Sequence, residues 1–205
     1  MITTSAASRQ PTKERLLHAG VRLFAEKGFR ETTVGQVEEA AGLEPRRGAL
    51  YRHFPSKEAL LEAALARHLE VMADTSAFDP VSGGDIRTEA LALGRWLLAE
   101  LDREHAIVRI LEQDGARLPE LRDAFRRSLV DTGYALAIEM ARRWLGPAAD
   151  AVDIDIVAVT LLGALVNFRR SRWTFGAPPL DMDDDRFLSG WADLCARSAS
   201  ALAPP

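Results

Sequence analysis

Cysteine is nearly absent from the 205-residue chain, in which Cys195 is the single example. One thiol cannot form a disulfide within the chain, which excludes a disulfide-stabilised fold and is typical of a reducing compartment. The longest apolar run, IVAVTLLGALVNF, is shorter than the ~20 residues of a membrane-spanning helix. The N-terminus also lacks the apolar segment of a signal peptide. We therefore expect a cytoplasmic protein with no membrane partner.

Patterns typical of catalytic and metal sites are also absent. The four histidines have no HxxxH or ExxH spacing for zinc, and there is no glycine-rich phosphate loop or serine-elbow motif. The acidic run DMDDD, residues 181–185, lacks the glycine and glutamate of a calcium loop, and one of its aspartates is better suited to cap the last helix. The sequence therefore predicts a protein that is not an enzyme and needs no cofactor or metal.

Charge of one sign does not dominate, because the net charge is only −4. Its distribution is uneven: residues 1–60 carry 10 Lys and Arg against 7 Asp and Glu, and the remainder carries 16 against 23. A mildly basic N-terminal part suits local contact with a polyanion, although so small an excess also arises by chance.

Apolar residues recur at helical spacing along most of the chain, and the sequence shows no repeat and no convincing strand pairing. A second helix is capped by Thr32 or Thr33 and ended by Gly42, and a short third helix contains GALYRHF. Ser56 and Pro119 are suited to begin later helices. The other expected helices cover about residues 12–27, 57–74, 85–102, 104–113, 119–145, 153–172 and 184–202. The sequence thus predicts an all-α protein of about nine helices.

The stretch GALYRHFPSKEALL combines large apolar residues with hydrogen-bond donors. Leu50 and Phe54 lie four residues apart, share one helix face and can anchor it against the first two helices. Tyr51, Arg52 and His53 then face solvent with donors that phosphates and base edges accept. A glycine-containing turn precedes them, which indicates the second helix of a helix-turn-helix, the usual reader of a major groove.

These residues resemble the DNA-binding domain of the TetR (tetracycline-repressor-like) family over about residues 12–62. The shared pattern is a Thr-Thr helix start, Ala-Gly at the turn, Gly-x-Leu-Tyr-x-His-Phe, and Lys-Glu-x-Leu at the next helix. The resemblance implies a homodimeric, ligand-responsive regulator, usually a repressor, that binds palindromic operator DNA. It implies an N-terminal three-helix helix-turn-helix domain at 1–56 and a larger helical effector-binding and dimerisation domain at 57–205.

The resemblance also implies which residues contact DNA. Thr33, Tyr51, His53 and Lys57 match family positions that contact phosphates or the groove. The alternative is structural: Tyr51 packs under the first helix, and His53 and Lys57 are ordinary surface residues.

The turn departs from the family pattern Ala-Gly-Val-Ser-x-Gly-x-Leu-Tyr. It reads AGLEPRRGALY, two residues longer and without the capping serine. Pro45 as a first helical residue extends the helix by about half a turn and places Arg46 and Arg47 near the bases, where arginine can bind guanine. The alternative is a basic turn that contacts only phosphate, or nothing. Glu38 replaces the usual alanine, and we expect its carboxylate to point away from DNA or to pair with an arginine.

The last two long helices are expected to form the homodimer. The stretch DIDIVAVTLLGALVNF, residues 153–168, is apolar nearly all round and must be covered on several sides, and residues 184–202 carry an apolar stripe. Paired across a two-fold axis they form a four-helix bundle, as in the family. The alternative is that residues 153–172 are the core of a monomer.

A pocket for a largely apolar small-molecule effector is expected mainly from the resemblance. Aromatic walls with a few polar side chains are typical of such pockets, although aromatics at helical spacing are more often plain core. The candidate residues are Trp96, His105, Arg109, Phe125, Trp144 and Asn167. The competing hypothesis is a helical protein-binding module whose N-terminal part docks another protein, which the longer turn favours.

Overall fold

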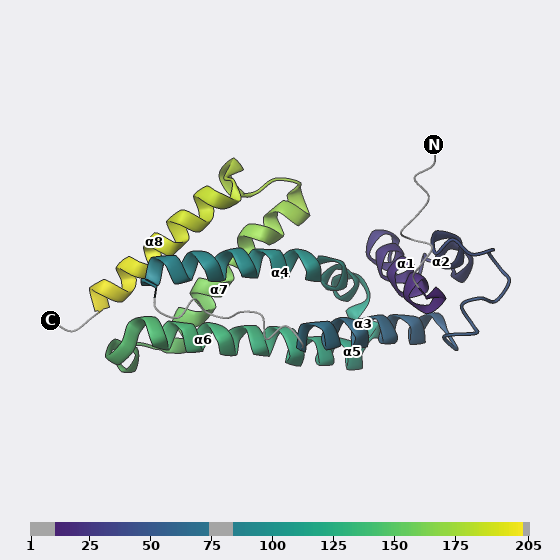
Figure 1. The fold of residues 1–205 in the computed structure, drawn as a ribbon, viewed down its shortest axis with the longest axis horizontal. Helices are drawn as coiled ribbons and strands as arrows, with labels where there is room; N and C mark the ends of the chain where they lie inside the picture. Colours follow the sequence, from purple (N-terminus) through teal and green to yellow (C-terminus); the bar gives the residue numbers. More distant parts are fainter. Residues whose placement is uncertain (1–10, 74–83, 203–205) are drawn as a thin grey trace. The chain divides into compact units, whose positions relative to one another are not determined.

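The computed structural model describes residues 11–73 and 84–202, and within them it contains helices and no β-strand (Figure 1). The predicted all-α class is therefore confirmed. The α-helices are α1 (Thr12–Lys27), α2 (Val34–Ala40), α3 (Lys57–Ala73), α4 (Ile86–Asp114), α5 (Pro119–Phe125), α6 (Thr132–Leu145), α7 (Ile154–Phe175) and α8 (Asp184–Leu202). A π-helical segment, Arg126–Asp131, joins α5 to α6, and 3₁₀ turns occur at Gly115–Arg117, Gly146–Ala151 and Pro179–Asp181.

The segment 119–145 is one continuous helix if its π-helical middle is included. Counted in this way, the described residues contain seven helices, whereas about nine were predicted. The predicted helices 85–102 and 104–113 are one helix, α4, because nothing between them breaks a helix. Arg103 continues it and bonds Glu100 one turn earlier. The predicted third helix is a single helical turn and is described with the site below.

Helix ends follow the local capping signals of the sequence. The Ala59 N–H donates to the Ser56 hydroxyl at 3.1 Å at the start of α3, and the Arg186 N–H donates to the Asp183 carboxylate at 2.7 Å at the start of α8. Both caps satisfy a backbone donor that the first helical turn leaves unpaired. The predictions for Ser56 and for the aspartate run are confirmed.

The chain divides into two compact units, which share α4. We call residues 1–74 and 105–125 the head unit, and residues 75–104 and 126–205 the body unit. The predicted domain boundary at residue 56 stays a prediction. Within the described residues, no helix is both long and apolar enough to cross a membrane.

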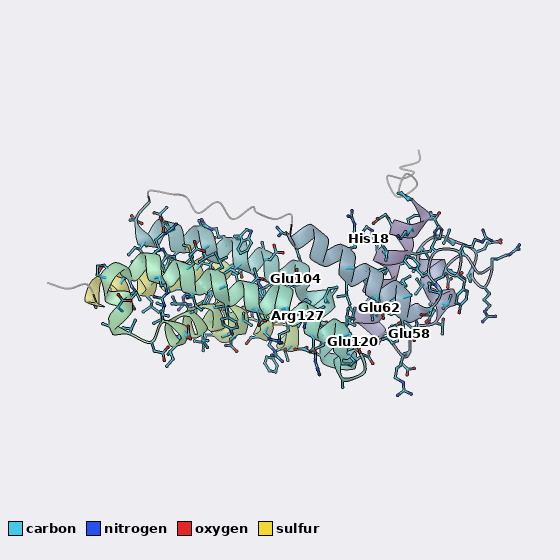
Figure 2. All side chains as sticks on the ribbon, turned by 90° about the horizontal axis from the view of Figure 1, so that it is seen from below. His18, Glu58, Glu62, Glu104, Glu120 and Arg127 are labelled. Carbon is cyan, nitrogen blue, oxygen red and sulfur yellow. The ribbon has the colours of Figure 1, made fainter. Side chains whose placement is uncertain are left out.

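The head unit has a small apolar core between α1, α2 and α3. Gly20 allows the close packing of α1 on α3, because a Cβ atom there would lie 2.3 Å from Leu60 Cδ2. α3 leaves Glu58 and Glu62, labelled in Figure 2, on its exposed side. The core residues are Leu16, Leu23, Phe24, Val37, Leu50, Phe54, Leu60, Leu61 and Leu65.

The body unit buries a larger apolar core, formed by α4, α6, α7 and α8. Gly94 of α4 lets α8 approach, since a Cβ atom there would lie 2.6 Å from Leu188 Cδ2. Trp144 and Trp191 meet edge to face with ring centroids 6.5 Å apart. Arg169 is buried beside this core and is neutralised by Asp184, with which it forms two hydrogen bonds of 3.4 and 2.8 Å.

Cys195 lies in this core, and its burial raises the pKa of the thiol to about 12. The folded state therefore favours the neutral thiol, and this contribution to stability is lost as pH rises above the ordinary cysteine pKa of ~8.5. At pH 8 we expect the folded protein to react with Ellman's reagent about three orders of magnitude more slowly than the guanidinium-unfolded chain, because far less thiolate is present. Equal rates in the two states would contradict this placement of the thiol.

Candidate nucleic-acid interface

Residues 41–56 connect α2 to α3 through turns and bends, and contain one helical turn. The N–H groups of His53 and Phe54 both donate to the Leu50 carbonyl oxygen at 2.9 Å. Leu50 and Phe54 are buried, while Tyr51 is 59% exposed and Arg52 and His53 are exposed. The predicted anchoring by two apolar residues is confirmed, and the donors between them face solvent.

The predicted extension of this helix to Pro45 is wrong. Arg46 has a φ of +64° and Gly48 a φ of +68°, both in the left-handed region that a right-handed helix cannot contain. Arg46 and Arg47 therefore lie on a turn that precedes the helical turn, with both side chains exposed. Arg47 Nε lies 2.9 Å from Glu44 Oε2, an ion pair in solvent that contributes little to stability.

Glu38 of α2 organises this turn from inside the head unit. Its side chain is fully buried, and its two carboxylate oxygens accept from different backbone N–H groups. Oε2 accepts from Arg46 at 2.7 Å, and Oε1 accepts from Leu50 at 3.0 Å. The carboxylate points inward, as one alternative expected, and it bonds the main-chain amide of Arg46. Sequence reasoning missed this role because the donors lie 8 and 12 residues further along the chain.

Thr33 and Arg46 line one shallow hollow on the head surface. Thr33 caps α2: its hydroxyl accepts from the Gln36 N–H at 3.3 Å, and the Gln36 side chain accepts from the Thr33 N–H at 2.8 Å. A Cβ atom on Gly35 would lie 3.7 Å from Arg46 Cγ, so the arginine stem runs along the first turn of α2. The hollow is lined by Thr33, Gly35, Gln36, Glu39, Pro45 and Arg46.

Lys57 is engaged within the head unit. Its ammonium group donates to the carbonyl oxygens of Phe29 at 2.5 Å and Thr32 at 2.9 Å, and lies 4.3 Å from the centre of the Phe29 ring. The Phe29 N–H donates to the carboxylate of buried Asp114, the last residue of α4, at 3.0 Å. These contacts hold the connection between α1 and α2, a role that sequence reasoning did not foresee for Lys57 or Asp114.

The six residues predicted to bind an effector are divided between the two units. Trp96, Trp144 and Asn167 belong to the body unit, and the other three belong to the head unit. Trp144 and Phe125 are buried, whereas Arg109 and Asn167 are exposed. His105 is half-buried, as is Trp96.

Trp144 lines a narrow cavity inside the body unit. The walls are aliphatic and aromatic side chains and one glycine, contributed by α4, α6, α7 and α8. The indole N–H of Trp144 donates to buried Glu89 at 2.9 Å, and Arg143 also bonds this carboxylate. The cavity wall is therefore apolar throughout, and of the six predicted residues only Trp144 belongs to it.

Large apolar side chains are exposed on α7 and α8. Ile156 is 63% exposed, Val159 52% and Leu194 65%. Ile156 also borders an apolar groove between α6, α7 and α8. Ile156 and Val159 are three residues apart and therefore share one face of α7.

Residues 16–64 match the family model described as "Bacterial regulatory proteins, tetR family". The match contains the capped start of α2, the turn held by Glu38 and the anchored helical turn. Residues 16–64 therefore belong to the TetR family. It is 34% identical over 111 residues to the HTH-type transcriptional repressor KstR2 of Rhodococcus jostii, covering 54% of this chain and 52% of that protein.

A second relative is the HTH-type transcriptional regulator YvkB of Bacillus subtilis, 29% identical over 112 residues, which cover 55% of this chain and 57% of YvkB. The chain thus spans about half the length of these curated relatives. Both are named as regulators of transcription, which are not enzymes.

Solved structures show that the TetR fold extends over most of the chain. A transcriptional regulator from Saccharomonospora viridis in complex with choline has a TM-score of 0.68 at 19% identity, covering 89% of this chain and 94% of that chain. The fatty acid degradation regulator FadR from Bacillus halodurans has a TM-score of 0.64 at 15% identity, covering 92% and 96%.

Proposed function

We propose that this TetR-family protein is a ligand-responsive transcriptional repressor that binds palindromic operator DNA as a homodimer. The observation that carries the proposal is the anchored helical turn of the head unit, whose buried Leu50 and Phe54 hold Tyr51, Arg52 and His53 in solvent. Exposed donors beside the arginines of the turn are suited to phosphates and base edges.

Exposed side chains of the head unit are the proposed DNA contacts. Tyr51 and His53 act from the helical turn, and Thr33, Arg46 and Arg47 act from the hollow and the turn beside it. Lys57 already donates to backbone carbonyls, so we propose that it serves DNA binding mainly by holding the connection between α1 and α2.

Two copies are proposed to associate through α7 and α8. The exposed apolar residues on these helices include Ile156, Val159 and Leu194. Burying each against the same face of a second copy gives a closed two-fold interface. The two head units then read the two halves of a palindrome. This role in operator binding also supports a cytoplasmic location, in the compartment that holds bacterial DNA.

The proposed effector is a small, largely apolar molecule that binds in the body unit. The cavity beside Trp144 has no charged wall and is too narrow as it stands, so the effector selects a conformer in which α6 and α7 move apart. Of α4, residues 86–104 belong to the body unit and residues 105–114 to the head unit, where Asp114 bonds Phe29. We propose that a shift of α4 moves the segment between α1 and α2, which Asp114 holds. The free energy of operator binding then falls by the difference between the effector-binding free energies of the two conformers.

Selection of bound duplexes from fragments of the source genome tests operator binding. We expect a recovered operator to bind with an affinity that falls steeply with salt, because several phosphates are neutralised. Arg47→Ala is expected to weaken operator binding about tenfold. A phosphate contact by Arg47 also predicts that the slope of log binding constant against log salt concentration falls in magnitude by about 1. The matched control is Arg142→Ala, an exposed arginine of the body unit, which leaves both quantities unchanged.

Failure of the wild-type protein to show salt-sensitive binding to any duplex would contradict the function. Selective loss of binding to a protein partner in Tyr51→Ala, with no effect on DNA, would favour the alternative in which the head docks another protein.

The dimer is tested by Ile156→Arg. A charge in the centre of the proposed interface cannot be paired across the two-fold axis, so we expect a monomer in analytical ultracentrifugation and at least tenfold weaker operator binding. Val130→Arg is the control, because Val130 is also an exposed apolar residue and lies on neither α7 nor α8. A dimer that survives Ile156→Arg and Leu194→Arg would place the interface elsewhere.

A further inference from the structure

We infer that Glu38 is the positioning residue of the DNA-recognition turn, and that it replaces the capping serine that the turn lacks. The inference rests on the proposed operator binding and adds a specific determinant to it. Glu38 is a glutamate with no exposed surface, and each of its two oxygens accepts one backbone N–H of the turn, at 2.7 and 3.0 Å.

The turn contains backbone donors that need acceptors. The helical turn begins at Leu50, whose N–H has no helical acceptor before it and points into the buried side of the segment. Between Gly42 and Tyr51 the sequence LEPRRGAL offers no serine or threonine as an N-cap. A buried N–H without an acceptor costs about as much as a lost hydrogen bond. Glu38 supplies the acceptor from the neighbouring helix.

The turn is two residues longer than the family pattern. Lengthening the turn places a second N–H, that of Arg46, within reach of the same side chain. One hydroxyl oxygen at a cap position serves the start of its own helix, whereas a carboxylate has two oxygens and can accept from two separate points. The longer turn and the glutamate at position 38 are therefore two parts of one arrangement.

Glu38 also affects where the arginine side chain of the turn lies. The bond from Glu38 holds the amide of Arg46 while that residue has a left-handed backbone, and the arginine stem then lies along Gly35. The arginine is thereby directed into the hollow that Thr33 also lines. Glu38 thus sets where the basic side chains of the turn are presented.

Glu38→Gln tests the inference in the full-length protein. The amide has one acceptor oxygen and an NH₂ donor, so one of the two N–H groups loses its partner. We expect operator affinity to fall at least tenfold at fixed salt, with a smaller loss on a non-specific duplex and an altered preference in duplex selection. Neutralising a carboxylate near DNA would by charge alone strengthen binding, so the expected direction is opposite to a simple charge effect.

Glu26→Gln is the matched control, because Glu26 is an exposed glutamate of α1 that does not line the hollow. We expect it to leave operator affinity unchanged. Glu38→Asp tests whether the length of the side chain matters. Aspartate keeps the carboxylate but is one methylene shorter, so it cannot reach both backbone amides. We expect this variant to lose operator affinity as Glu38→Gln does. A Glu38→Asp protein with wild-type affinity would overturn the geometric part of the inference.

A rescue experiment separates positioning from general stability. Glu44→Ser with removal of Pro45 and Arg46 converts the turn to the shorter, serine-capped pattern AGLSRGALY. Each change alone is expected to weaken duplex binding. Because the shorter turn lacks Arg46, a proposed DNA contact, we expect its combination with Glu38→Ala to bind less tightly than the wild type but more tightly than the sum of the two separate losses predicts. Additive losses in the combined protein would show that the turn and Glu38 act independently, and would overturn the inference.

Amide hydrogen exchange provides a readout that does not depend on DNA. We expect the Arg46 and Leu50 amides to be protected in the wild-type protein and to exchange rapidly in Glu38→Gln. Rapid exchange of both in the wild type would overturn the role of Glu38. If no duplex binds the wild type while these amides are protected, the proposed function fails and the local role of Glu38 stands. Equal affinity and equal duplex preference in Glu38→Gln and wild type would refute its role in recognition.

Discussion

The head unit depends on one constraint: a single helical turn must stay folded although a turn of that length is unstable alone. Helix nucleation is unfavourable in water, so residues 50–54 need tertiary support. Burial of Leu50 and Phe54 supplies it, at about 1.5–3 kcal/mol for each side chain. The carboxylate of Glu38 adds the missing acceptor at the start of the turn. With both in place, the polar side chains between the two anchors are exposed and available to a partner.

Other contacts of the head unit hold the chain segment between α1 and α2. Lys57 holds the connection between α1 and α2 through backbone carbonyls, and Asp114 at the end of α4 bonds Phe29 in the same connection.

In the body unit, Glu89 accepts the hydrogen bond of the Trp144 indole, and the cavity wall is apolar. The exposed apolar face of α7 and α8 lies in that unit as well. Recognition, effector binding and assembly are thus proposed for separate surfaces of one chain.

Local signals in the sequence were sufficient for much of the fold. The helix starts marked by Thr33, Ser56 and Pro119 were predictable, because capping and the fixed φ of proline act within a few residues. The anchoring by Leu50 and Phe54 was predictable from their spacing alone. The DNA-contact residues could be proposed because short motifs carried the resemblance to the TetR family.

Features that depend on distant residues were not predictable. Pro45 suggested a helix start, but the left-handed backbone at Arg46 is held by Glu38, eight residues earlier. Lys57 looked like a surface cation, although its acceptors lie more than twenty residues away in the sequence. Of the predicted effector residues only Trp144 lines the cavity of the body unit, because helical spacing identifies a buried face without showing which helix covers it. Only packing decides whether an aromatic residue such as Phe125 lines a cavity or fills the core.

The most direct measurement is a crystal structure of the protein bound to an operator duplex recovered by selection. It is predicted to show Leu50 and Phe54 still buried, the Glu38 carboxylate still on the amides of Arg46 and Leu50, and Tyr51 with the arginines of the turn within hydrogen-bond distance of DNA. A complex in which DNA contacts another surface, with Tyr51, Arg46 and Arg47 left in solvent, would contradict the central claim.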